Sequence, residues 1–186
     1  MNKMEILTSK WMMIACIVIT FGVILLILGK KSVHSEIIVN APKEKIWQVL
    51  LNTEEYEQWN SVINSVEGIL KEGERVKFMF HQEEGKSYPI SAKVRKVETN
   101  SLLNQFGGYT GIITYNHTYT LNESDTNTKV IIHEEYNGLM VPFWNPKPVQ
   151  KAYDRLNKDI KKRVESLTFE GEGCAISLAS ASIMTE

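Results

Sequence analysis

Hydrophobic positions along the chain form three patterns: an unbroken run, a series of alternating segments and one helical stripe. The unbroken run covers residues 11–29, WMMIACIVITFGVILLILG, and contains no charged residue. At about 1.5 Å per residue, a helix of this length reaches about 28 Å, close to the hydrocarbon thickness of a bilayer. Lys10 and Lys30 bracket the run, and Trp11 lies where an indole favours the interface. We therefore predict a transmembrane helix over 11–29, after an N-terminal flank over 1–10.

Two other interpretations of this run compete with the span. A cleaved signal peptide has a shorter apolar core and a small-x-small cleavage site, and LILGKKSVHS provides neither clearly. A buried core helix is apolar along one stripe, whereas this run is apolar on every face. More lysines follow the run closely than precede it, and basic flanks tend to stay cytoplasmic. The expected protein is single-pass, with its domain on the cytoplasmic side of the membrane.

After the run, the pattern changes to the period-two alternation of β-strands. The first segment, SVHSEIIVN, places Ser35, Ile37 and Val39 on one face. Six later segments have the same character, and the short polar connectors between them favour an antiparallel meander. These predicted strands cover 62–69, 74–82, 88–98, 101–106, 111–121 and 129–136.

Between the first two strands the apolar spacing becomes helical. Pro42 is pre-organised for a first helical turn, and the apolar stripe that follows has Trp47 at its edge. Asn52 and Glu55 have the spacing of a capping box, which predicts the start of a second helix carrying Trp59. The sequence thus predicts two short helices directly after the first strand.

The third pattern is a long amphipathic stripe near the C-terminus. Three prolines in LMVPFWNPKP exclude regular structure, and the last of them, Pro148, can open a helix. Apolar residues then recur at helical spacing from Val149 to Leu167, opposite a basic face. We interpret that face as solvated, with contact to anionic headgroups as the alternative. The remainder, 168–186, has no clear period, and we expect a poorly ordered tail.

This order of elements predicts an α+β fold with an internal cavity. A curved antiparallel sheet of six to seven strands has one apolar face that needs cover. A single long helix cannot cover the whole width of such a sheet. We therefore expect the two short helices to close one end, and a cavity to remain between the sheet and the long helix.

The residues that open and close this region resemble a known superfamily. IIVNAPKEKIW over 37–47, followed by Tyr56-x-x-Trp59-Asn60, resembles the start of START-like, or Bet v 1-like (SRPBCC), domains. TKVIIHEEYNG over 128–138, followed by a long helix, resembles their last strand and terminal helix. The superfamily includes the polyketide cyclase/dehydrase and lipid-transport group, and proline often follows its second tryptophan, where this chain has Asn60-Ser61.

The resemblance covers about 33–167 and implies a helix-grip fold, in which the sheet wraps around the long C-terminal helix. Many members bind lipids, sterols, polyketides or other apolar molecules, so it also implies a hydrophobic ligand. A fold-level analogy does not identify that ligand. The implied domain organisation is the flank, the anchor over 11–29, a START-like domain over 33–167 and the tail.

One pair of polar residues falls on the inward face of the last predicted hairpin. His117 shares its strand face with Tyr115 and Tyr119, and Glu134 lies on the corresponding face of the next strand. An antiparallel register can place His117 opposite Glu134, and a histidine beside a carboxylate in an apolar pocket is a plausible acid/base pair. The candidate catalytic residues are therefore His117, Glu134 and Tyr115. The alternatives are a cross-strand hydrogen bond without catalysis, or a register that differs by one residue.

The residues expected to contact a ligand are inward-facing strand positions, the long helix and the tryptophan at the second turn. We expect Trp47 to anchor its helix to the sheet, and Trp59 to lie near the cavity mouth. The predicted ligand contacts are Trp59, Phe78, Phe80, Ile90, Ala92, His117, Tyr119, Ile132, Glu134, Tyr136, Tyr153 and Leu156.

Composition and motifs remove several function classes. The net charge of −1 gives no basic surface for nucleic acid. The four histidines lack a ligand spacing and no cysteine lies near them, so we expect no metal. No phosphate loop or dinucleotide fingerprint occurs, and we expect no cofactor. Gly107 and Gly108 most simply indicate a turn or bulge.

Three functions are compatible with these observations. The leading hypothesis is a membrane-anchored binding domain for a hydrophobic small molecule or lipid. The second is a cyclase- or dehydratase-like enzyme that uses a His/Glu/Tyr pocket. The third is an interaction domain without a pocket, in which bulky side chains fill the gap under the helix.

Overall fold

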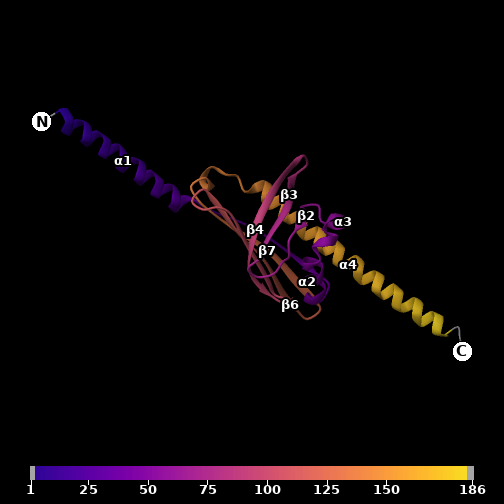
Figure 1. The fold of residues 1–186 in the computed structure, drawn as a ribbon. Helices are drawn as coiled ribbons and strands as arrows, with labels where there is room; N and C mark the ends of the chain where they lie inside the picture. Colours follow the sequence, from indigo (N-terminus) through magenta and orange to yellow (C-terminus); the bar gives the residue numbers. More distant parts are fainter. Residues whose placement is uncertain (1–2, 184–186) are drawn as a thin grey trace.

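The architecture is a curved sheet packed on one long helix, with a second helix extending away from them (Figure 1). A computed structural model describes the backbone of residues 3–183 and the side chains of residues 10–25 and 27–167. The extending helix is α1, Lys3–Leu28. Within this described part of the chain, no helix is both long and apolar enough to cross a membrane. The predicted transmembrane helix over 11–29 is therefore not supported.

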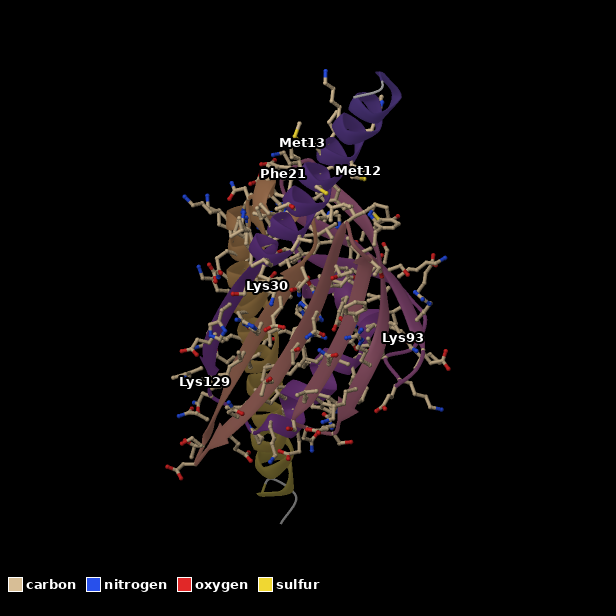
Figure 2. The ribbon with its side chains drawn as sticks, turned by 90° about the vertical axis from the view of Figure 1, so that its left-hand side faces the viewer. Met12, Met13, Phe21, Lys30, Lys93 and Lys129 are labelled. Carbon is tan, nitrogen blue, oxygen red and sulfur yellow. The ribbon has the colours of Figure 1, made fainter. Side chains whose placement is uncertain are left out.

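Seven antiparallel strands form a single sheet in the order β1-β7-β6-β5-β4-β3-β2. The strands β2 to β7 form the predicted meander, and β1 joins it by pairing with β7. Most inward positions of the strands are apolar, whereas the outer face carries charged side chains such as Lys93 and Lys129 (Figure 2). The bounds are β1 Lys30–Val39, β2 Ile63–Glu67, β3 Arg75–Glu83, β4 Lys86–Glu98, β5 Leu102–Tyr109, β6 Ile113–Ser124 and β7 Asn127–Asn137.

Three short helical elements connect the two edge strands, β1 and β2. They are α2 (Lys43–Leu51), the 3₁₀ turn η1 (Thr53–Glu55) and α3 (Tyr56–Trp59). Trp47 is buried in the core, in agreement with the expected anchor. The predicted capping box is wrong, because Asn52 makes no side-chain cap and Glu55 instead pairs with Arg163 of the long helix.

Asn60 and Ser61 account for the missing proline after the second tryptophan. The buried Asn60 Oδ1 accepts hydrogen bonds from the backbone N–H groups of Val62 (3.0 Å) and Ile63 (2.7 Å). The Ser61 N–H donates to Asp159 Oδ2 at 3.0 Å. A proline at position 61 has no N–H and would lose this bond to the long helix.

The long helix, α4 (Lys147–Ile183), covers the concave face of the sheet. Its predicted apolar stripe is buried from Val149 to Val164. The proline-rich segment before it contains one short 3₁₀ turn, η2 (Val141–Phe143). The helix continues past Leu167, where the apolar stripe ends, to Ile183. Residues 184–186 of the predicted tail lie outside the described residues, and the domain boundaries stay a prediction.

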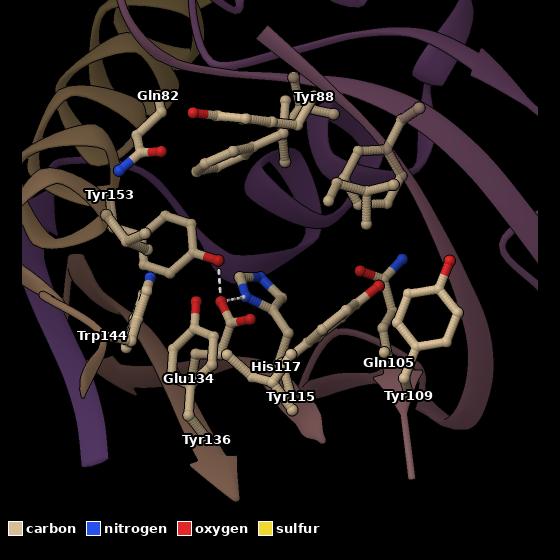
Figure 3. Close-up of a pocket in the computed structure, with 17 residues that line it drawn as sticks. Gln82, Tyr88, Gln105, Tyr109, Tyr115, His117, Glu134, Tyr136, Trp144 and Tyr153 are labelled. Atoms are coloured by element: carbon tan, nitrogen blue, oxygen red, sulfur yellow. Dashed lines mark hydrogen bonds and ion pairs between the residues drawn. The ribbon is translucent and has the colours of Figure 1, made fainter. Parts of the chain in front are cut away.

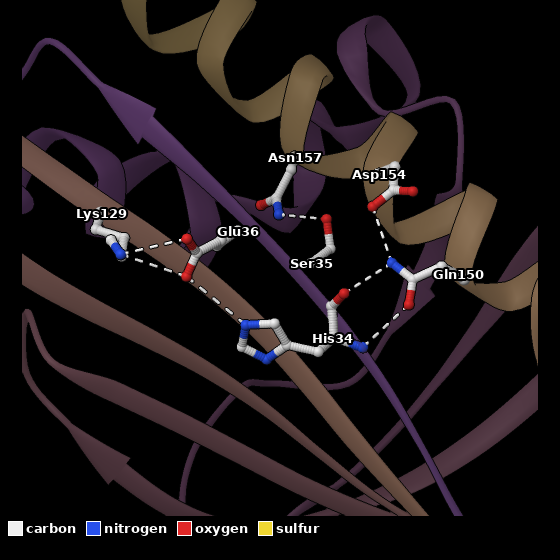
Figure 4. Close-up of polar contacts among 7 residues, drawn as sticks. All are labelled: His34, Ser35, Glu36, Lys129, Gln150, Asp154 and Asn157. Carbon is white, nitrogen blue, oxygen red and sulfur yellow. Dashed lines mark hydrogen bonds and ion pairs between the residues drawn. The ribbon is translucent and has the colours of Figure 1, made fainter.

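Polar contacts fix α4 along the edge strand β1 (Figure 4). Gln150 Nε2 donates to the His34 carbonyl at 2.7 Å, and Gln150 Oε1 accepts from the His34 N–H at 3.2 Å. Two helical turns later, Asn157 Nδ2 donates to Ser35 Oγ at 2.9 Å. The bonds of Gln150 satisfy backbone groups that an edge strand leaves without a ladder partner. Together these contacts also set the position of Tyr153, which lies between Gln150 and Asn157 on α4.

Candidate functional site

A cavity of about 430 Å³ lies between the sheet and the first turns of α4 (Figure 3). Side chains from β2 to β7, the segment before α4, and α4 itself line it. It is partly open to solvent. The interpretation of the domain as pocketless is wrong, because the bulky side chains do not fill the whole gap under the helix.

Most of the predicted site residues on the sheet line this cavity. Period-two alternation predicts which side chains of a strand face inward, and in the structure these residues do lie on the inward face. The predicted residues that line the cavity are Tyr115, Phe78, Phe80, Ile90, His117, Glu134, Tyr136 and Tyr153.

The other predicted ligand contacts do not line the cavity. Ala92, Tyr119, Ile132 and Leu156 are buried in the core, closer to the end of the sheet that α2 and α3 cover. Alternation gives the face of a strand but not the depth along it, so sequence cannot separate core from cavity wall. Trp59, expected near the cavity mouth, lies instead in a separate groove beside α4.

The position of Trp59 follows from the shortness of α3. Tyr56 occupies the inward side of this single turn, and its hydroxyl donates to the Leu50 carbonyl at 2.6 Å. Trp59 packs edge-on against Tyr56, with ring centroids 5.1 Å apart, and lies in the same groove as Arg163 and Leu167.

Sequence reasoning missed several residues of the cavity wall. Gln105 lies directly opposite His117 in the ladder, and its signal was a polar residue at an inward position of a predicted strand. Trp144 belongs to the proline-rich segment, where no periodicity exists to assign a face. Its ring packs against Tyr136 with centroids 4.2 Å apart.

The predicted turn or bulge at Gly107 and Gly108 is wrong, since β5 continues through both to Tyr109. Gly107 pairs with Tyr115 in the ladder. A Cβ on Gly107 would lie 2.2 Å from the Tyr115 hydroxyl oxygen and 2.6 Å from the Ser91 carbonyl. Glycine is therefore required at this position because the Tyr115 side chain crosses its backbone, where the hydroxyl donates to the Ser91 carbonyl at 3.0 Å.

A buried cluster of three polar side chains forms one wall of the cavity. His117 faces Glu134 across the β6–β7 ladder, and His117 Nδ1 lies 3.1 Å from Glu134 Oε2. The Tyr153 hydroxyl of α4 donates to the same oxygen. All three side chains belong to residues that are at most 5% exposed. A carboxylate can only accept hydrogen bonds, so facing an ionised Glu134 the Nδ1 of His117 carries the proton and donates it.

The second ring nitrogen of His117 differs from the first in its surroundings. Within the described part of the chain, Nε2 is buried and makes no hydrogen bond. A buried polar atom left in this state costs about 1–3 kcal/mol. With Nδ1–H directed at Glu134, Nε2 of the neutral ring is a lone-pair acceptor, and of the charged ring a donor. Figure 3 shows the ring between Glu134 and the open part of the cavity.

Two further phenols in the cavity wall are held in their protonated form. Burial raises the pKa of Tyr136, and the charge and hydrogen bond of Glu134 raise it further. Burial also raises the pKa of Tyr115, with a smaller contribution from the Glu134 charge. Both hydroxyls are therefore hydrogen-bond donors across the physiological pH range.

The described residues include no group of three or more His, Cys, Asp or Glu side chains placed to hold a metal ion. What the wall does combine is aromatic and aliphatic surface with a few convergent polar groups, centred on His117. This arrangement is typical of sites that bind a largely apolar small molecule in a defined orientation. A histidine whose outer nitrogen is free, and whose inner nitrogen donates to a carboxylate, is also competent for proton transfer.

The similarity to solved structures with this fold covers about three quarters of the chain. The structure of TTHA0849 from Thermus thermophilus has 18% sequence identity and a TM-score of 0.60, covering 74% of this chain and 99% of that one. A START superfamily protein from Mycobacterium smegmatis has 19% identity and a TM-score of 0.57, covering 73% and 98%. At these identities the likeness shows the fold alone.

Sequence comparison identifies the family more directly. No curated protein matches the chain. Residues 30–165 match the family described as polyketide cyclase / dehydrase and lipid transport, a range that includes every strand and the described cavity wall. Together with the START-like fold, this match shows that the chain belongs to the polyketide cyclase / dehydrase and lipid transport family of the SRPBCC superfamily.

Proposed function

We propose that the domain binds a hydrophobic small molecule or lipid in the cavity under α4. The observation that carries this proposal is the free, buried Nε2 of His117 in an otherwise apolar wall. A cavity of about 430 Å³ is within the usual range for small-molecule sites, roughly 300–1,000 Å³. The family description, which includes lipid transport, supports the same class of ligand.

The polar wall restricts the kind of apolar ligand. Nε2 of the neutral His117 ring accepts a hydrogen bond, so the best ligand carries a hydroxyl or amide donor at one end. The hydroxyls of Tyr115 and Tyr136 already donate to the Ser91 carbonyl and to Glu134, so each offers a ligand its oxygen as a hydrogen-bond acceptor. A pure hydrocarbon leaves Nε2 unpaired and binds more weakly for that reason.

Native mass spectrometry of the full chain, released from detergent micelles, tests the proposal. We expect a molecule to copurify with the wild-type chain and to be lost in the variant Ile90→Trp, because the bulky indole ring occupies the cavity. The matched control is Ile38→Trp, since Ile38 is exposed on the outer face of β1. If no molecule copurifies, and a panel of fatty acids, fatty alcohols and isoprenoids gives no thermal shift, ligand binding is excluded.

A second candidate function is acid/base catalysis of the cyclase or dehydratase type. The His117–Glu134 pair favours it, because the carboxylate holds the ring with Nε2 free to take a proton from a bound substrate. The test is to incubate the copurified ligand with the wild-type chain and with His117→Gln, and to compare its mass and structure. A ligand that is recovered unchanged from the wild-type chain rules out this function.

The domain is further proposed to attach to a lipid bilayer through α1, on the cytoplasmic side. Large apolar side chains are exposed along the helix, among them Met12, Met13 and Phe21, which project clear of the sheet (Figure 2). Exposing apolar side chains to water around the whole helix is energetically unfavourable. Alkaline carbonate extraction of isolated membranes separates surface attachment from insertion, and protease accessibility in sealed vesicles reports the side. Recovery of the whole chain in the supernatant without any extraction contradicts the proposal.

A further inference from the structure

Exposed apolar side chains gather on two turns at one end of the sheet. Tyr109 and Ile112 belong to the β5–β6 turn, and Met140 and Phe143 to the segment between β7 and α4. All four are at least half exposed, and Tyr109 and Phe143 reach 75% and 69%. We name these four residues the apolar rim. Two backbone hydrogen bonds tie the turns together, from Leu139 N–H to the Gly111 carbonyl and from Met140 N–H to the Ile112 carbonyl.

The base of α1 is bound to the same place. Gly138 N–H donates to the Gly29 carbonyl at 3.0 Å, directly where α1 ends and β1 begins. The Lys31 ammonium donates to the carbonyls of Pro142 and Trp144 in the η2 segment. A Cβ on Gly29 would lie 2.2 Å from the Gly138 carbonyl oxygen, so the two backbones are in close contact. The apolar rim therefore stands directly beside the point where α1 leaves the domain.

The cavity opens at this end of the sheet and is closed at the other. Tyr109 of the apolar rim and Trp144 beside it are cavity-lining residues, and the partly exposed Tyr88 lies across from them at the start of β4. The opposite end is covered by α2 and α3, whose apolar side chains belong to the buried core. A molecule that enters the cavity therefore passes the apolar rim.

The exposed surface of α1 indicates what covers the apolar rim. A protein partner buries one stripe of a helix, whereas α1 carries exposed apolar side chains around its circumference. Exposed apolar surface of this extent marks a membrane-interaction site, and the boundary between the headgroups and acyl chains of a bilayer accommodates it. Because the rim adjoins the base of this helix, the same environment reaches the rim.

We propose that the apolar rim docks on a lipid bilayer, so that the cavity mouth faces the membrane and an apolar ligand passes between the two without crossing water. The inference rests on the proposed bilayer attachment of α1 and on the proposed ligand binding. It adds an orientation of the domain and a route for the ligand, which neither of those proposals contains.

Site-specific quenching tests this orientation on the full chain. Cys16→Ala and Cys174→Ala leave a background in which a single cysteine, at Ile112→Cys or Phe143→Cys, carries a fluorescent label. The protein is added to vesicles of phosphatidylcholine and phosphatidylglycerol in which the phosphatidylcholine acyl chains are brominated. We expect bromine to quench both labels strongly. The matched control is Ile69→Cys, because Ile69 is equally exposed (71%) but lies at the closed end of the sheet, and its label stays unquenched.

The outcomes distinguish this inference from the proposals beneath it. Labels on the rim that are quenched no more than the label at position 69, in protein that cosediments with the vesicles, overturn the docking of the rim while attachment through α1 stands. A rim label that responds to protein concentration in the absence of vesicles shows a contact between copies of the chain and also overturns it. A chain that does not cosediment with vesicles overturns both attachment and docking, whereas native mass spectrometry decides ligand binding independently.

The route of the ligand has its own measurement. In the double variant Met140→Ser/Phe143→Ser, we expect transfer of the copurified ligand from vesicles into the cavity to slow several-fold. The amount of ligand bound at equilibrium is expected to stay unchanged, since neither residue lines the cavity. Equal transfer rates in the double variant, the control Ile69→Ser and the wild-type chain overturn the proposed route.

Discussion

At one end of the sheet, side chains of α2 and α3 fill the space beneath α4, and at the other end the space is left as the cavity. Tyr119 and Tyr115 illustrate the difference, because they lie on the same face of β6, four residues apart. Tyr119 is enclosed in the core, whereas Tyr115 lines the cavity. Where the two short helices add a layer, the void beside Tyr56 and Tyr119 measures only about 20 Å³, whereas the cavity of about 430 Å³ remains where only α4 and the segment before it cover the sheet. The first end supplies stability and the second supplies the site.

The largest expected effect is the difference in stability lost when an isoleucine is truncated at the closed end and at the cavity end. Ile132→Ala, at the closed end, removes a fully buried side chain and should lower the free energy of unfolding by about 2–5 kcal/mol. Ile113→Ala, in the cavity wall, should cost less than about 1 kcal/mol, because one side of Ile113 already faces empty space. Chemical denaturation followed by circular dichroism measures both. Similar losses at the two positions would contradict the contrast between the ends.

The next effect concerns the buried polar cluster in the cavity wall. Glu134→Gln removes the charge that His117 and Tyr153 share, and we expect a loss of about 1.5–3 kcal/mol in stability, the range for hydrogen bonds to charged groups. Tyr153→Phe removes one of the two bonds and should cost about 1 kcal/mol. The same denaturation experiment provides the values. Full stability in Glu134→Gln would mean that the cluster does not stabilise the packing of α4 on the sheet.

Two asparagines at the closed end give a smaller effect. Asn60→Ala removes two hydrogen bonds to buried backbone N–H groups and should cost about 1–2 kcal/mol. Asn52→Ala should change stability by less than about 0.5 kcal/mol, because Asn52 makes no side-chain cap. The melting temperatures of the two variants show directly which substitution is more destabilising. If Asn52→Ala is as destabilising as Asn60→Ala, the capping box exists after all.

The smallest effect is a loss of stability that begins only in alkali. The pKa of Tyr136 and that of Tyr119 are raised in the folded chain, so the folded state holds these protons more tightly than the unfolded state. Their contribution to stability is fully present below about pH 10, the ordinary tyrosine value, and is lost as the pH rises above it. Ultraviolet difference titration measures the pKa of each tyrosine hydroxyl, and Tyr→Phe variants assign each transition to its residue.

The same titration of the variant Glu134→Gln compares how strongly the Glu134 charge affects a tyrosine at each end of the sheet. The charge of Glu134 is the second cause of the raised pKa at Tyr136, after burial, and it also forms a hydrogen bond there. At Tyr119 burial dominates and Glu134 is the last cause of the raised pKa. We therefore expect the substitution to lower the pKa of Tyr136 more than that of Tyr119. Equal shifts would show that the cluster is not confined to the cavity wall.

Sequence reasoning reached further for the closed end than for the open one. Alternation predicted the strands, and the helical stripes predicted α2 and α4, because burial of one face imposes a period on each element. The pairing of His117 with Glu134 followed from the same alternation together with a short hairpin connector. The capping box at Asn52 failed because Glu55 finds a stronger partner in Arg163, more than one hundred residues away in the chain.

The sequence by itself determined the order of elements, the inward faces of the strands and the family resemblance, since these depend on local periodicity and short motifs. Tertiary structure alone decided where the core ends and the cavity begins, because depth along a strand depends on which distant element covers it. It removed Trp59 from the cavity wall, added Trp144 and Gln105, and made Gly107 a space for the Tyr115 side chain. It also left His117 Nε2 without a partner among the described residues, which no pattern of single residues can reveal.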